Sequence, residues 1–302
     1  MKRPPVLQAN DKAIILSPAG RIGATYVEKA ISILKQWRLD VEISENALCH
    51  FGRFSGFVEQ RLHDLQAAFD DEQVKMILCS RGGYGTVHLL DKIDFTGIKK
   101  SPKWLVGYSD ITALHAALQT QGIMSVHGPM TKHFAEEGSN DPAVLYTKAI
   151  LAGQSIQYQL PVAKNSFLNR EGKATGQLFG GNLTVFCGLL GTSVLTIPRG
   201  GILFVEDIGE EPYKVDRMLH QLKLAGVFKK IKGLIVGQFT DYEEDQSMHG
   251  ALHECIYKTV SEYDFPVSFD FPVGHVTLNF PLIMGARATL HVKKNQVLFK
   301  QH

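Results

Sequence analysis

Short apolar runs alternate with segments of helical period over residues 13–126, and this alternation constrains the fold more than any other feature. The runs AIILS, VKMILCS and KWLVGYS are apolar almost throughout, as in strands buried on both faces. Segments such as ATYVEKAISILKQW, FVEQRLHDLQAAF, YGTVHLLDKI and DITALHAALQTQ space apolar residues three and four apart. The pattern predicts a doubly wound α/β domain with a parallel sheet, whose ligands gather at the carboxyl ends of the strands.

The second half of the chain has a different pattern. Periodicity fades between about 135 and 172, where EEGSNDPAV and LPVAKNSFLNREGK are polar and rich in turn formers. We therefore expect two domains, residues 1–150 and 151–302. The second contains the Gly-rich segment GQLFGGNLT, the strands GILFVED and IKGLIVGQF, the helix PYKVDRMLHQLKLAG and a final hairpin. These predict a mixed α/β domain with antiparallel or barrel-like strands.

Charge and composition exclude several classes of function. The chain has 32 basic and 30 acidic residues, so its charge favours neither nucleic acid nor an anionic membrane, and we expect a small-molecule partner. No apolar run approaches the ~18 residues of a membrane span, and we expect a cytoplasmic protein. The four cysteines are far apart and no metal-ligand motif appears, so we expect neither metal nor cofactor.

Ser109 lies in GYSDITALH, between an apolar strand and a helix whose apolar face includes Leu114. At such a turn its hydroxyl would leave the carboxyl edge of the sheet, where the N–H of Asp110 could hold an oxyanion. The G-x-S-x-G signature of a nucleophile elbow is incomplete, because Ile111 replaces the last glycine. The residues alone leave open that Ser109 merely caps the helix.

A second turn, SRGGYGT at 80–86, ends the preceding strand and should face the same cleft as Ser109. Its glycines allow a close approach of backbone N–H groups to a ligand, and Arg81 could bind a carboxylate through two hydrogen bonds. A solvated turn and a phosphate cradle are the alternatives. Neither G-x-G-x-x-G nor the Walker pattern is present here.

A serine nucleophile needs a base, and the chain has 12 histidines. His275 lies in FPVGHVTLNFP, a loop in which glycine and proline favour display of the side chain over packing. His127 in SVHGPM is the rival, because it also ends a strand. His88 and His115 fall in segments of helical period, where surface or core roles are more common.

A carboxylate that orients the base is expected in the acidic cluster EDIGEE. Glu206 ends an apolar strand beside buried surface, which suits that role. Asp207, Glu210 and Glu211 compete for it. The alternative is that the cluster caps the helix that begins near Pro212 and complements its dipole, which we expect of Glu210 or Glu211.

Taken together, these segments resemble the serine LD-carboxypeptidases, or muramoyltetrapeptide carboxypeptidases, of bacterial cell-wall recycling. The resemblance covers nearly the whole chain and is carried by six blocks in the family's order: SRGGYG at 80–85, GYSDITALH at 107–115, HGP at 127–129, GGNLT at 180–184, FVEDIGEEPYKVDRML at 204–219 and PVGH at 272–275. It implies that Ser109 is the nucleophile, His275 the general base and Glu206 the orienting carboxylate. It also implies that the N-terminal domain carries the serine and the C-terminal domain the other two.

The resemblance also implies further details of the site. The backbone amides of Gly83 and Asp110 would be the oxyanion donors, with Gly82 as the alternative to Gly83. Asn182 in GGNLT is expected to cap a helix. The sequence departs from many relatives at His88, where they have an arginine, and this affects only the details of the pocket.

The substrate implied by the resemblance is a muropeptide tetrapeptide, cleaved between its diamino acid and terminal D-alanine. We expect Arg81 to bind the free terminal carboxylate, because an exopeptidase must recognise a chain end. The family suggests a homodimer. Alternatives are a related self-immunity hydrolase for an aminoacyl-nucleotide antibiotic, whose aromatic or nucleotide-facing insertion is not identified here, and a non-catalytic small-molecule or nucleotide-binding protein.

Overall fold

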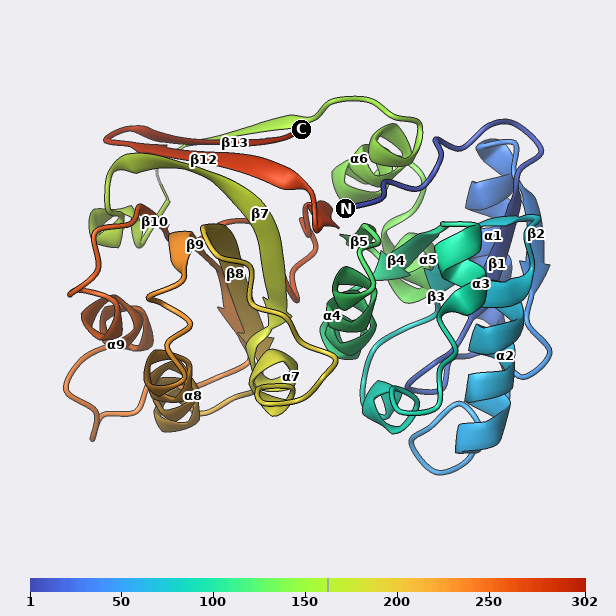
Figure 1. The fold of residues 1–302 in the computed structure, drawn as a ribbon, viewed down its shortest axis with the longest axis horizontal. Helices are drawn as coiled ribbons and strands as arrows, with labels where there is room; N and C mark the ends of the chain where they lie inside the picture. The colour runs from blue at the N-terminus through green and yellow to red at the C-terminus, as the bar shows by residue number, and fades with distance from the viewer. Residues whose placement is uncertain (162) are drawn as a thin grey trace. The chain divides into compact units, whose positions relative to one another are not determined.

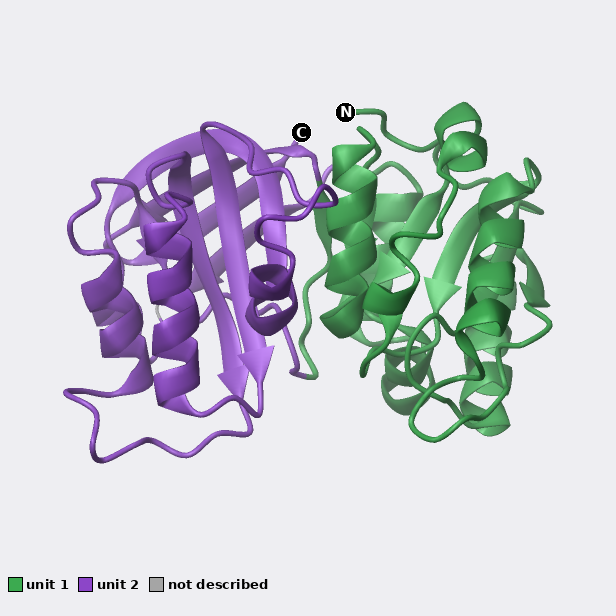
Figure 2. Ribbon diagram, turned by 60° about the horizontal axis from the view of Figure 1, so that its bottom comes forward, with its two compact units in different colours: residues 1–154, 277–284 green, residues 155–276, 285–302 purple. Residues whose placement is uncertain are grey.

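Two sheets organise the protein in the computed structural model, which describes residues 1–161 and 163–302. The chain divides into two compact units (Figure 2). The first unit comprises residues 1–154 and 277–284, and the second comprises residues 155–276 and 285–302. The sequence predicts a second domain of residues 151–302, whereas the segment 277–284 belongs to the first unit of the structure.

The first unit has a six-stranded sheet of order β11-β5-β4-β3-β1-β2 (Figure 1). Five strands run parallel, and β11 joins as an antiparallel edge strand that pairs with β5. The order of the five parallel strands confirms the doubly wound prediction. The strands are β1 (Lys12–Leu16), β2 (Asp40–Ile43), β3 (Val74–Cys79), β4 (Trp104–Gly107), β5 (Ser125–His127) and β11 (Leu282–Met284).

Burial explains the strands of the first unit. All four residues of β4 are buried, as expected for a central strand that is covered on both faces. The helices of this unit differ in burial: the first two bury a single face, whereas the fourth has seven consecutive buried residues. They are α1 (Ala24–Gln36), α2 (Val58–Asp70), α3 (Thr96–Lys100), α4 (Thr112–Thr120), α5 (Thr131–Glu137) and α6 (Pro142–Leu151).

One predicted helix of the first unit is wrong. The segment 84–93 forms only the single 3₁₀ turn η1 (Thr86–His88), followed by turns. Gly85 precedes η1 with φ +122°, a conformation outside the helical region. The loop after β3 is therefore irregular rather than helical where it leaves the edge of the sheet.

The second unit has an open seven-stranded sheet of order β10-β9-β8-β7-β12-β13-β6. Its first four strands pair in parallel and β7, β12, β13 and β6 pair antiparallel. The predicted mixed domain is confirmed, and among the described residues the sheet does not close into a barrel. The strands are β6 (Gln157–Pro161), β7 (Gly172–Asn182), β8 (Gly201–Ile208), β9 (Ile231–Thr240), β10 (Val267–Ser268), β12 (Arg287–Lys293) and β13 (Gln296–Gln301).

Three helices cover one face of the parallel half of this sheet (Figure 1). They are α7 (Leu183–Gly188), α8 (Pro212–Leu224) and α9 (Leu252–Thr259), and the 3₁₀ turn η3 (Ser166–Leu168) contacts α9. Between them and the sheet lies an apolar core that includes Phe179, Phe186 and Leu219. None of the helices in the described part of the chain has the length and hydropathy that crossing a membrane requires.

Candidate active site

Ser109 occupies a strained turn at the carboxyl end of β4. Its φ of +65° lies in the left-handed region, which costs free energy for any residue except glycine. The 3₁₀ turn η2 (Ser109–Ile111) follows and leads directly into α4. The strand, sharp turn and helix match the geometry of a nucleophile elbow, although the sequence lacks the last glycine of that signature.

Glycines bring the neighbouring loops against this turn. A Cβ added to Gly82 would lie 2.6 Å from the Ser109 Cβ and 2.8 Å from its Oγ, so only glycine fits at this position. The loop after β1 approaches in turn, because the Gly20 N–H donates to the Gly82 carbonyl at 3.1 Å. Gly83 has φ +113°. The loops after β1, β3 and β4 are thus held together at one edge of the sheet, as the sequence predicted for the last two.

The side chain of Asp110 joins two of these loops. Its buried carboxylate accepts a hydrogen bond from the Thr86 N–H at 2.8 Å, which fixes the loop after β3 to the turn after β4. The sequence predicts a role only for the backbone N–H of Asp110, and no local pattern indicates this use of its side chain. Both candidate oxyanion donors, Gly83 and Asp110, therefore belong to segments that this one carboxylate connects.

Arg81 lies half-buried on the same loop as the glycines. Its Nη1 donates to the Arg21 carbonyl at 3.4 Å, a long hydrogen bond, and its side chain runs past Gly20. The guanidinium is therefore placed at the edge of the sheet near Ser109, within the first unit. Its role in binding a carboxylate remains a prediction.

Two other histidines of the first unit are embedded in the sheet region. The Nε2 of His115 donates to the Gly107 carbonyl at 2.8 Å, and its Nδ1 lies 2.7 Å from the Ser125 Oγ. Burial is the largest cause that lowers the pKa of His115, to about 4, so this ring is neutral at pH 7. His127, the alternative to His275 as the predicted general base, is fully buried on β5. The burial of His115 and His127 is typical of histidines that pack in the interior of a domain.

The second unit holds a buried carboxylate and imidazole in direct contact. Glu206 on β8 is fully buried, and its Oε2 lies 2.8 Å from the Nδ1 of His275. His275 lies in the loop after β10, with 15% of its side chain exposed. A carboxylate at Nδ1 fixes the tautomer and orientation of an imidazole, which then acts as a base through Nε2.

The local backbone explains how Glu206 reaches His275. Opposite Glu206 the register of β8 and β9 shifts, since Val205 pairs with Val236 but Asp207 pairs with Phe239. The extra residue of this bulge is on β9, where the Gln238 N–H donates to the Val273 carbonyl at 2.9 Å, two residues before His275. Gly274 completes the fit with φ +127°, because a Cβ there would lie 2.8 Å from Oε2 of Glu206.

Burial and charge act in opposite directions on this pair. Burial is the largest effect on Glu206 and raises the pKa of its carboxyl above the ordinary value, although the hydrogen bond from His275 opposes it. Burial also acts to lower the pKa of His275. The hydrogen bond and charge of Glu206, with smaller effects of Asp207 and Asp241, outweigh it, so the pKa of His275 is raised.

The other acidic residues of the cluster have different partners. Asp207 accepts hydrogen bonds from the Asn182 Nδ2 at 2.8 Å and from both the N–H and Oγ1 of Thr184. Asn182 also caps α7, as predicted, by accepting from the Val185 N–H. Glu211 stands at the start of α8 but makes an ion pair with Lys214 rather than a side-chain cap. Glu206 is therefore distinguished from its competitors by geometry.

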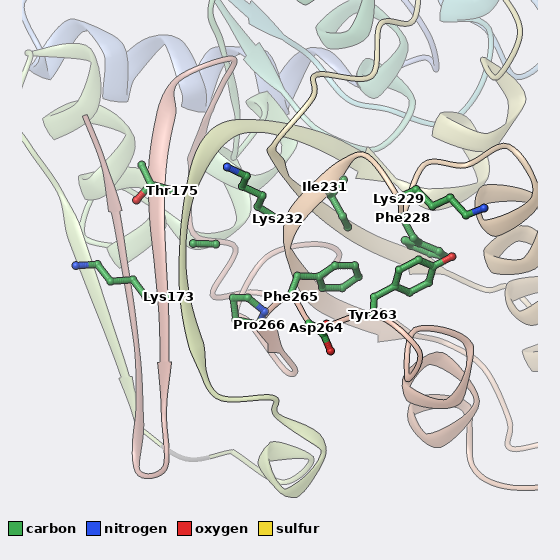
Figure 3. Close-up of a pocket in the computed structure, with 11 residues that line it drawn as sticks. Lys173, Thr175, Phe228, Lys229, Ile231, Lys232, Tyr263, Asp264, Phe265 and Pro266 are labelled. Atoms are coloured by element: carbon green, nitrogen blue, oxygen red, sulfur yellow. The ribbon is translucent and has the colours of Figure 1, made fainter.

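A cavity of about 550 Å³ in the second unit lies elsewhere, at the amino ends of β7 and β9 (Figure 3). Glu206, by contrast, lies toward the carboxyl end of β8. The cavity is lined by Lys173, Lys229 and Lys232, whose ammonium groups point in different directions in Figure 3. Within residues 1–161 and 163–302, no group of three or more His, Cys, Asp or Glu residues is arranged to hold a metal ion.

Comparisons with known proteins agree with these observations. The LD-carboxypeptidase N-terminal domain matches residues 14–128, and the LD-carboxypeptidase C-terminal domain matches residues 175–290. The probable murein peptide carboxypeptidase of Bacillus subtilis is 32% identical over 99% of this chain and 94% of its own length.

Solved structures share the fold. The crystal structure of muramoyltetrapeptide carboxypeptidase from Oxalobacter formigenes has a TM-score of 0.87 and 30% identity, covering 96% of this chain and 98% of that one. The microcin C7 self-immunity protein has a TM-score of 0.86 over 99% of this chain and 98% of its own, but its 20% identity is evidence for the fold alone. The two matched domains and the relative that spans nearly the whole chain place this protein in the LD-carboxypeptidase family.

Proposed function

We propose that this protein is a serine-type LD-carboxypeptidase that releases the terminal D-amino acid, D-alanine, from muropeptide tetrapeptides. The observation that carries the serine assignment is the φ of +65° at Ser109, on a turn so closely packed that Gly82 cannot bear a Cβ. A helix cap does not require this strain, whereas a nucleophile that must project its hydroxyl does. The names of the relatives supply the substrate class.

In this proposal three side chains from two units act together. The Nε2 of His275 removes the hydroxyl proton as Ser109 Oγ attacks the carbonyl carbon of the scissile LD-amide. Glu206 holds the imidazole through Nδ1 and stabilises the imidazolium that forms. The backbone N–H groups of Gly83 and Asp110 donate to the oxyanion of the tetrahedral intermediate. These roles require no metal ion.

The intermediate then collapses. The carbon–nitrogen bond breaks, and the imidazolium of His275 returns its proton to the leaving amine, so that the D-amino acid departs neutral at nitrogen. A water molecule attacks the resulting acyl-serine, with His275 again as base. Hydrolysis of the ester releases the shortened peptide and restores the Ser109 hydroxyl.

Arg81 is proposed to bind the terminal carboxylate of the substrate. Its position on the loop that carries Gly82 and Gly83 supports this role, since a guanidinium binds a carboxylate through two hydrogen bonds. Replacement by alanine should raise KM sharply with a smaller effect on kcat. Equal turnover of free and C-terminally amidated peptides would contradict the role.

The decisive experiment measures D-alanine released from an LD-linked tetrapeptide. Wild-type protein should release it, and Ser109→Ala should abolish nearly all turnover, because the attacking oxygen is lost. Ser44→Ala is the matched control: Ser44 is a buried serine of the same unit, hydrogen-bonded to Asp64 at 2.6 Å, and should leave turnover intact. Equal release by Ser109→Ala would show that the nucleophile is misassigned.

Two parts of the proposal rest on the family resemblance. We propose that the protein works in the cytoplasm on recycled cell-wall fragments and that it forms a homodimer. Cell fractionation tests the location, and analytical ultracentrifugation tests the dimer. An aminoacyl-sulfamoyl nucleoside assayed beside the tetrapeptide distinguishes the self-immunity reaction, and preferential cleavage of that compound would replace the peptide assignment.

A further inference from the structure

Arg61 is a buried cation near the start of α2. It is 2% exposed and shares the buried face of the helix with Leu65 and Ala68, four and seven residues later. An arginine on such a face is costly unless it is paired or hydrogen-bonded. Its presence there needs a reason that packing alone does not provide.

The guanidinium of Arg61 connects two loops at the edge of the sheet that carries Ser109. Its Nη1 donates to the carbonyl of Pro18 at 2.7 Å and to the carbonyl of Gly85 at 2.8 Å. It also lies over the Phe54 ring, 5.1 Å from the centroid. A Cβ added to Gly85 would come within 2.9 Å of Nη1, so this glycine makes room for the contact.

The residue after Gly85 continues the connection to the nucleophile turn. The Thr86 N–H donates to the buried carboxylate of Asp110, immediately after Ser109. Arg61 and Asp110 also interact electrostatically: burial acts most strongly to lower the pKa of Arg61, and the negative charge of Asp110 opposes that shift. Arg61, the loop after β3 and Asp110 thus form one continuous network within the first unit.

We propose that Arg61 is a positioning residue that sets the spacing between the two backbone oxyanion donors, Gly83 and Asp110. It holds the loop of Gly83 from one side, while the Asp110 carboxylate holds the same loop from the other. This inference rests on the proposed function and deepens it, because it assigns the preorganisation of the oxyanion site to a side chain that touches neither substrate nor nucleophile. Preorganised donors act on the transition state more than on bound substrate.

Lys103 offers a matched control in the same unit. It is also a fully buried cation, and its Nζ donates to the carbonyls of Ala68, Phe69 and Asp71 at 2.9, 3.0 and 2.5 Å. It precedes β4 and so lies at the opposite end of that strand from Ser109. Removing either cation leaves buried carbonyls without a donor, but only Arg61 is connected to the oxyanion loop.

The test compares Arg61→Met, Arg61→Lys and Lys103→Met by tetrapeptide hydrolysis, fluorophosphonate labelling of Ser109 and thermal unfolding. Arg61→Met should lower kcat about 100-fold, the usual effect of losing one oxyanion donor, with KM changed by less than about threefold. Arg61→Lys keeps the positive charge but loses the planar guanidinium, and its kcat should be about tenfold higher than that of Arg61→Met. Lys103→Met should lower Tm while kcat and the labelling rate stay within about twofold of wild type.

Equal effects of Arg61→Met and Lys103→Met on kcat would overturn the inference, because both would then act through stability alone. If Arg61→Met does not fold, Arg61→Lys decides: an unchanged kcat and labelling rate would also overturn it. If the wild-type protein reacts with fluorophosphonate but releases no D-alanine, the proposed substrate is refuted. The role of Arg61 is then tested by the labelling rates of the variants alone. Wild-type protein that does neither would refute both.

Discussion

The candidate site residues of the two units are held by different physical means. In the first unit Ser109 is held by backbone strain and by glycines that admit no Cβ. In the second unit the fully buried carboxylate of Glu206 accepts a hydrogen bond from the Nδ1 of His275 at 2.8 Å. Steric changes should therefore damage the residues of the first unit at every pH, whereas those of the second unit should respond to changes of charge and pH.

The largest effect should follow removal of the charge in the second unit. Glu206→Gln keeps the shape of the side chain but removes the carboxylate that fixes the His275 tautomer, and kcat should fall by about 10⁴. Glu211→Gln is the control, because Glu211 belongs to the same acidic cluster but is exposed and pairs with Lys214. A loss below about tenfold for Glu206→Gln would mean that His275 is oriented by something else.

The second-largest effect is expected from a steric change beside Ser109. Gly82→Ala would place a Cβ 2.6 Å from that of Ser109, so the nucleophile must move. We expect kcat to fall about 100-fold, the scale of a displacement near 1 Å, with little change in the pH profile. Gly23→Ala is the control in the same unit, because its φ of −83° suits any residue and an added Cβ would meet no atom nearer than 3.6 Å. Similar activities of the two variants would show that the contact at Gly82 is unimportant.

A smaller effect concerns pH. The pKa of His275 is raised by Glu206, and a general base must be neutral, so the acidic limb of kcat/KM should lie above the ordinary imidazole value of about 6.5. Glu206→Gln removes the charge that favours the imidazolium, and the limb of its residual activity should move to lower pH. A limb that moves to higher pH, or a limb unmoved by this substitution, would contradict the pairing.

The smallest effect on activity is expected next to Glu206 in the chain. Asp207 accepts hydrogen bonds from Asn182 and Thr184, so Asp207→Asn should lower the free energy of unfolding by about 1–3 kcal/mol. We expect kcat to stay within about threefold. Urea denaturation and the peptide assay measure the two quantities. A loss of activity as large as that of Glu206→Gln would remove the distinction between the two neighbours.

The sequence predicted the parts of the fold that depend on local pattern. Buried strands such as β3 and β4 are apolar throughout, and parallel strands place their following loops at one edge, which is why Ser109 and the loop of Gly82 could be placed together. Local pattern could not predict that β11, which follows most of the second unit in the chain, belongs to the sheet of the first unit. Its place in that sheet depends on pairing with β5, more than 150 residues earlier in the chain, which no local signal records.

Within the site, residue types were easier to predict than partners. The acidic cluster was visible, but the choice of Glu206 over Asp207 depends on the contact with His275, 69 residues later in the chain, which no local signal records. No role is predicted for Arg61 from the sequence, although a signal existed. Arg61 has helical spacing with Leu65 and Ala68, so the apolar face of the predicted helix includes a cation that must be buried. The predicted helix at 84–93 failed because Gly83 and Gly85 adopt positive φ.

The central claim is that the serine of one unit is activated by the imidazole of the other. The rate of fluorophosphonate labelling, with the modified peptide identified by mass spectrometry, tests it most directly in the full chain. We expect labelling at Ser109 in the wild-type protein and a rate at least about 1,000-fold lower in His275→Ala, since the attacking oxygen then lacks its base. Labelling of Ser109 at the same rate in both proteins would contradict it.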